Sequence, residues 1–311
     1  LFLEKFFIGL VIFYLTLILS NLLGQNYKDY ILIIKIICIL SFIHFIIIKY
    51  DSFIKFKLKK KINFINFFIS VFFIILLTEN YIDIKLYTLE AGDALAYWFN
   101  KTKYFLYSPG LEHFPKPDYP NFLSSIWSFS FYIFEKDYDQ SRIIIPLVLF
   151  LGILLIFQKI RLIFKNNNIY LNSILFLIIL IHFSTYSFAA SYRFSNSGYV
   201  DGLLSLFLMI GFLYIYLSIN NETFNKKDYF FGIVILGISS SIKNEGFVIS
   251  TAVFFILNLY FYLFFKKKFT DNLNILIVNS LIFLIIIFIP ILLSFYLESL
   301  KLQFLVKISL I

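Results

Sequence analysis

Three short polar segments of a largely apolar chain contain residue types that can do chemistry. The first segment, EAGDALAYW at 90–98, places Asp93 directly after a glycine, which lets a ligand approach the backbone closely. A carboxylate there could act as general base on an acceptor hydroxyl or amine. Aspartate is also among the best helix N-caps, and the stretch after it is helix-like. The two roles are compatible.

Aromatic and proline residues of the same region suggest how a ligand could be held. Trp98 or Tyr97 could form a wall on which a sugar ring stacks, although a tryptophan beside a membrane belongs more often to the interfacial aromatic belt. The run HFPKPDYP at 113–120, which contains Asp118, predicts a rigid turn into the next helix. No cofactor is expected, but Asp93, Asp118 and Glu245 could meet around a divalent cation, a possibility the sequence leaves open.

The second segment, SYRFSNSGYVDG at 191–202, contains Arg193 and Asp201. Asp201 stands at the start of an apolar run, where it could complement the helix dipole or orient an acceptor or a base. Arg193, or Lys243 of the third segment, could bind a lipid-linked phosphate, because cations stabilise phosphate charge in a partly desolvated site.

The third segment, SSSIKNEGF at 239–247, contains the trio Lys243, Asn244 and Glu245. The apolar run before it has about 14 residues and reaches ~21 Å, short of the ~30 Å hydrocarbon core. We therefore expect this turn to dip below the outer membrane surface. Ionisable groups at that depth are costly unless paired or facing water, and they mark functional sites by default. The simpler interpretation is a Lys243–Glu245 pair that closes a hairpin.

The composition defines the setting of these segments. Hydrophobic residues make up 60% of the 311 residues and charged residues 14%, against roughly 45–50% and about 25% in soluble domains. The apolar residues fall in runs long enough to cross a bilayer as helices. The sequence therefore predicts an all-α, multi-pass membrane protein. This excludes a cytosolic enzyme, a secreted domain and a nucleic-acid-binding module, despite the net charge of +9.

Lysine placement sets the expected topology, because short cytoplasmic loops collect Lys and Arg. Nine spans, with NFLSSIWSFSFYIF at 121–134 as an interfacial or re-entrant helix on the outer face, put more than half of the basic residues inside. The same model places the segments 79–142, 190–201 and 242–246 on one exterior face. The nine predicted spans are 6–23, 31–48, 62–78, 143–158, 169–190, 200–219, 229–242, 247–265 and 273–297.

This topology divides the chain into three parts. Residues 1–78 form three N-terminal spans, 79–142 a large structured outer (periplasmic) loop, and 143–311 a six-helix membrane region. Because the chain starts at a leucine and stops inside an apolar stretch, we expect it to be a fragment that lacks sequence at its C-terminus.

Taken in order, the motifs GDALAYWFNKTKYFLY, HFPKPDYPNFL, GYVDGLLSLFLMIG and SSSIKNEGFV resemble bacterial membrane glycosyltransferases of the GT-C type. The similarity is to the protein O-mannosyltransferase and aminoarabinose-transferase group and covers about 79–265. It implies inverting transfer of a sugar from a polyprenyl-phosphate donor to a glycan, lipid or protein acceptor, at the outer face of the plasma membrane. Asp93 would match the catalytic acidic residue of the first large outer loop. Asp201, Lys243, Asn244 and Glu245 would line the cavity. Two features depart from the family: three spans precede the large loop instead of one, and the usual C-terminal portion is missing.

Three other interpretations compete with this one. A transporter or flippase of lipid-linked sugars would place polar groups near the bilayer midplane, in symmetry-related halves, and the chain shows no evident internal symmetry. A polysaccharide polymerase or ligase would use a similar outer loop and donor, and only the resemblance disfavours it. In a catalytically inactive homologue, changing Asp93 or Lys243 would affect expression alone.

Overall fold

The computed structural model describes residues 2–23, 98–107, 120–134, 138–163 and 200–309, with scattered single positions between 30 and 82. Within these ranges the chain is helical and contains no strand. Four described helices are long and apolar enough to cross a membrane: α1 (Phe2–Leu22), α9 (Asp201–Asn220), α11 (Asn244–Phe264) and α13 (Leu273–Ser309). The prediction of an all-α protein is confirmed for the described residues, and these four helices agree with the predicted membrane protein.

Helix α10 (Lys226–Ile238) lies at the centre of the C-terminal half. All of its residues from Phe231 to Ile238 are buried, and Phe231 and Val234 retain 6% exposure. It packs along α9, α13, α1 and α11. Glycines bring α9 and α10 close together: a Cβ on Gly211 would meet the Leu236 backbone, and one on Gly232 would meet the Ile215 backbone nitrogen. Small residues at such seams are typical of helix packing in membranes, where backbone approach and van der Waals contact stabilise association.

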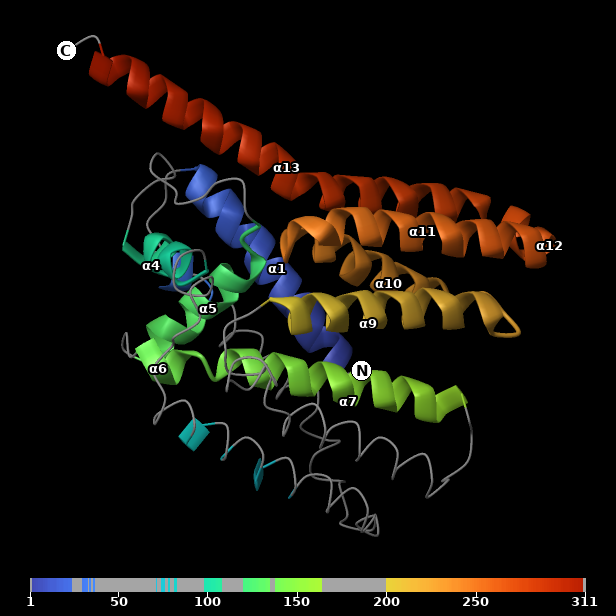
Figure 1. Ribbon diagram of the computed structural model, residues 1–311. Coiled ribbons are helices and arrows are strands. Elements are labelled where there is room, and N and C mark those ends of the chain that lie inside the picture. Colours follow the sequence, from blue (N-terminus) through green and yellow to red (C-terminus); the bar gives the residue numbers. More distant parts are fainter. Residues whose placement is uncertain are drawn as a thin grey trace, which may run out of the picture.

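Helices α9, α10, α11 and the first half of α13 lie side by side (Figure 1). The 3₁₀ helix η2 (Ser239–Ser241) joins α10 to α11, and the short basic helix α12 (Lys266–Asp271) joins α11 to α13. Helix α13 has 37 residues and contains Pro290, and its C-terminal part extends away from the other helices (Figure 1). At about 55 Å it is longer than the predicted span 273–297.

The N-terminal helix α1 and helix α7 (Ile144–Ile163) flank α9 and α10 and share one apolar core with them. Phe7 of α1 and Phe122 each pack edge-on against Phe207 of α9, with ring centroids 5.5 and 5.3 Å apart. The predicted spans 6–23, 143–158, 200–219 and 247–265 therefore all correspond to helices. The apolar part of α7 is shorter than the four spanning candidates.

Three short helices come from the predicted outer loop: α4 (Asn100–Tyr107), α5 (Phe122–Ile133) and α6 (Tyr138–Ser141). At 12 residues α5 is too short to cross the membrane alone. It is buried against α1, α4, α6 and α7, so it does not lie open on a surface as an interfacial helix would. Trp127 of α5 is fully buried and donates from Nε1 to Ser141 Oγ at 2.8 Å.

The remaining parts of the predicted topology are not described. The predicted span at 169–190 and almost all of those at 31–48 and 62–78 lie outside the described residues. The number of spans and the boundaries of the three parts therefore stay predictions.

Candidate functional site

The junction between α10 and α11 carries the polar groups of the third sequence segment. After η2 the chain becomes extended at Lys243 (φ −153°, ψ 153°), and α11 begins at the next residue. Gly246 lies so close to Ser239 that a Cβ there would collide with the Ser239 carbonyl. This close approach requires glycine at position 246.

Lys243 joins two carboxylates from different helices. Its Nζ donates a hydrogen bond to Asp201 Oδ1 at 2.8 Å and lies 3.5 Å from Glu245 Oε1. Asp201 is the first residue of α9 and Glu245 lies in the first turn of α11, positions where the helix dipole stabilises negative charge. We call these three residues the junction cluster. One ammonium and two carboxylates give it a formal charge of −1.

The electrostatics keep Lys243 in its charged form. The hydrogen bond to Asp201 is the main cause that raises the pKa of Lys243 above its ordinary value of 10.5, and Glu245 adds to this effect. Partial burial acts in the opposite direction and is outweighed. Because the pKa is raised, the ammonium and its ion pairs are present throughout the physiological pH range.

A pocket of about 350 Å³ opens on the other side of the same junction. It lies between the start of α11 and the part of α13 around Pro290, and Pro120 from the predicted outer loop completes it. Its polar lining comes from Ser240, Asn244, Ser294 and Glu298.

The structure brings together part of the predicted site. Asp201, Lys243 and Glu245 are in contact, and Asn244 faces the pocket. Asp93, Tyr97, Asp118 and Arg193 lie outside the described residues. The expected hairpin closure by a Lys243–Glu245 pair is present, but the shorter contact of Lys243 is to Asp201, 42 residues earlier in the chain.

Trp98 corrects one expectation. Its side chain is only 3% exposed and belongs to the apolar core, while its backbone oxygen accepts from Thr102 Oγ1 and Ser124 Oγ. A buried indole offers no face to a sugar ring, so in this structure Trp98 is a packing residue and not a stacking wall.

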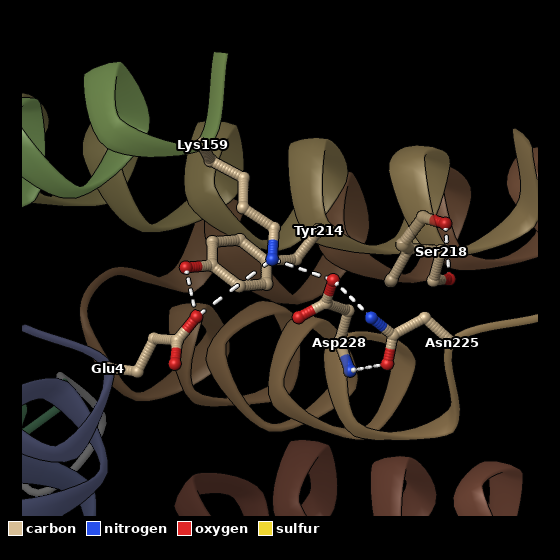
Figure 2. A network of polar contacts seen from close by, with 7 residues as sticks. Glu4, Lys159, Tyr214, Ser218, Asn225 and Asp228 are labelled. Carbon is tan, nitrogen blue, oxygen red and sulfur yellow. Dashed lines mark hydrogen bonds and ion pairs between the residues drawn. The ribbon is translucent and has the colours of Figure 1, made fainter. Parts of the chain in front are cut away.

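A second polar network lies near the opposite end of α9 and was not predicted (Figure 2). Lys159 of α7 donates to Asp228 Oδ2 at 2.6 Å and lies 3.9 Å from Glu4 Oε1. Its ammonium also sits 4.3 Å from the centre of the Tyr214 ring, a cation–π distance. Tyr214 in turn donates from its hydroxyl to Glu4 at 2.8 Å. We call these four residues the Lys159 network.

The Lys159 network connects four helices with its side chains largely withdrawn from solvent. Lys159 and Asp228 are each 13% exposed, and Glu4 is 27% exposed. Asn225 fixes Asp228 by donating from Nδ2 to its carboxylate and by accepting from its backbone N–H as the N-cap of α10. This N-cap pattern was the one signal in the sequence that could have pointed to Asp228.

Two buried cations were also missed. Lys101 of α4 is inaccessible and Arg142 is 3% exposed. Both come from the predicted outer loop. A charged side chain in a short polar stretch such as NKTK gives no sign of burial, because burial depends on helices distant in sequence.

The described residues include no group of three or more His, Cys, Asp or Glu side chains placed to hold a metal ion. Two residues of the predicted cation site, Asp93 and Asp118, fall outside that part of the chain. Comparisons with protein-family models, curated proteins and solved structures found no match to this chain.

Proposed function

We propose that this protein is a membrane glycosyltransferase. It transfers a sugar, with inversion, from a polyprenyl-phosphate donor to a lipid, glycan or protein acceptor at the outer face of the plasma membrane. The motif order in the sequence suggests this activity. The four helices that are long and apolar enough to cross a membrane support a setting in which a lipid-linked donor would be available.

The observation that carries the proposal is the 2.8 Å contact between Lys243 and Asp201. It joins the second and third motif segments, which are far apart in the sequence, at one end of the helix bundle. A site assembled from separate motifs is what a transferase with this motif order requires.

In the proposed reaction the acceptor oxygen or nitrogen attacks the anomeric carbon of the donor sugar. The bond between that carbon and the phosphate oxygen breaks, and its electron pair leaves with the lipid phosphate. Asp93 takes the proton from the acceptor. Lys243 is paired with two carboxylates in the structure. To stabilise the leaving phosphate, its ammonium group gives up the contact with Asp201 and binds a phosphate oxygen instead. Arg193 acts as a second cation.

The test uses membranes containing the full-length protein and a labelled polyprenyl-phosphate sugar, scanned over several sugars. Asp93→Asn should lower transfer at least about 100-fold, the scale expected when a general base is lost. Lys243→Gln should also reduce transfer strongly. Lys227→Gln is the matched control, because this exposed lysine lies in the first turn of α10, at the opposite end of the bundle.

Two results would count against the proposal. Equal transfer by wild type and Asp93→Asn at equal protein level would remove Asp93 from the mechanism. No transfer by the wild type with any sugar would favour a transporter or an inactive homologue.

A further inference from the structure

The charge in the lining of the pocket beside Pro290 of α13 is negative. Its described lining contains one charged side chain, the carboxylate of Glu298, and no Lys, Arg or His. The hydroxyls of Ser240 and Ser294 and the amide of Asn244 complete the polar part. Ser240 already donates its hydrogen to the Gly237 carbonyl at 2.9 Å, so its oxygen is left to accept. The pocket therefore favours ligands that donate hydrogen bonds.

The charges around the pocket act in two directions. The junction cluster, with its formal charge of −1, lies at the same turn as Asn244. The positive end of the α11 helix dipole lies at this turn too and opposes that negative charge. The preference for an ammonium group therefore depends on the Glu298 carboxylate in the lining, because opposite charges attract near a low-dielectric surface.

The pocket also has an apolar side that faces the membrane. Phe247, Ile291 and Phe295 line it, and the α13 residues Leu292 and Phe295 are 65% and 67% exposed. These side chains lie near the end of the apolar window of α13, Leu273–Tyr296, and so at the level where hydrocarbon meets polar head groups. A ligand can therefore enter sideways from the lipid, with its chain along α13 and its polar end toward Glu298.

We propose that this pocket binds the primary ammonium head of a single-chain membrane amphiphile, with Glu298 as its counter-ion and Ser294 as a hydrogen-bond partner. The chain of the amphiphile lies against Phe295 and Ile291. This binding does not depend on the proposed transferase activity. The pocket would bind a cationic head group, whereas the site proposed at Lys243 would bind a phosphate.

The test uses the full chain in a neutral detergent or in nanodiscs of zwitterionic lipid. The probe is a twelve-carbon alkylamine that carries a photoreactive diazirine near its head, and labelled peptides are identified by mass spectrometry. We expect saturable labelling of residues 290–298 that dodecylamine competes away and dodecyl phosphate does not. Glu298→Gln should raise the half-saturation concentration of the probe by about tenfold or more, as expected for loss of one charge-assisted hydrogen bond.

Two further variants keep the proposal falsifiable. Glu222→Gln is the matched control, because it removes an exposed carboxylate at the opposite end of α9 and should leave labelling unchanged. Ser294→Phe fills the pocket without changing its charge and should abolish labelling at 290–298, which covers the case in which Glu298→Gln does not fold. Equal labelling of wild type and Glu298→Gln, or equal competition by dodecyl phosphate, would overturn the proposal.

Discussion

Lys159 compensates two carboxylates in a region that is largely closed to water, and it contacts Tyr214 as well. Removing one partner of a buried ion pair leaves the other charge unpaired and is strongly destabilising. We expect Lys159→Met to lower the free energy of unfolding by about 2–4 kcal/mol, somewhat less than for a fully enclosed pair. Denaturation of the purified protein in one fixed detergent measures this change.

Two comparisons separate the ion pair from a general effect of losing lysine. Lys227→Met removes an exposed lysine from the same end of the bundle and should change stability by less than about 0.5 kcal/mol. In the double variant Lys159→Met/Asp228→Asn the cost should be smaller than the sum of the two single costs, because no unpaired charge remains at Asp228. Equal stability of Lys159→Met and Lys227→Met would contradict the role assigned to this network.

The sequence identified single charges better than it identified their partners. Asp201, Lys243 and Glu245 were recognisable because ionisable residues at the ends of apolar helices are conspicuous. The local Lys243–Glu245 pair was recognisable too, whereas the contact between Lys243 and Asp201 was not, because it depends on how α9 and α11 pack. The same holds for Tyr214 and Glu4, which bond across a separation of 210 residues. Local patterns specify helix ends and caps, whereas pairs between helices follow from packing.

At the scale of helices, the close packing of α9 against α10 depends on glycines, which have no side chain. A methyl group on Gly211 would overlap the backbone and Cβ of Leu236, and a backbone cannot rotate away as a flexible side chain can. We expect Gly211→Ala to destabilise the protein by about 1–3 kcal/mol, the usual cost of overpacking. Gly9→Ala in α1 meets nothing within 4 Å and should stabilise by up to about 1 kcal/mol, because alanine favours helix over glycine. Thermal unfolding of both variants in the same detergent tests the seam, and a Gly211→Ala variant as stable as Gly9→Ala would show that α9 and α10 are not so close.

Run length predicted helices well where one helix faces mostly lipid, as α11 does. It gave no decision for α5, because hydropathy does not distinguish a lipid-facing helix from one enclosed by other helices. The serines of α5 illustrate the reason: Ser125 and Ser128 donate to carbonyls of their own helix, Phe122 and Ser125. These hydroxyls are satisfied inside the helix, while Ser124 and Ser130 donate to backbone oxygens of Trp98 and Ser141 outside it.

At the scale of the whole molecule, the described lysine-rich linkers meet at one end and the junction cluster lies at the other. Lys159 reaches Asp228 just after the α9–α10 turn, and Lys268 donates to the backbone oxygens of Ile219 and Asn221 in that turn. The lysine pattern predicted that these linkers share one side. Their contacts in the structure agree with that grouping, which is the arrangement expected for the cytoplasmic side of a membrane protein.

The orientation predicted from the lysine pattern can be measured directly. In a Cys38→Ala background, single changes Glu222→Cys and Glu245→Cys put a thiol at each end of the bundle, and both parent residues are exposed. We expect a membrane-impermeant maleimide to label Glu245→Cys in intact cells and Glu222→Cys only after permeabilisation. Labelling of both from the same side would show that α9 and α10 do not carry these residues to opposite faces. The reverse pattern would place Lys243 on the cytoplasmic side, where an outward-facing transferase could not use it, and would overturn the proposed function while leaving the fold intact.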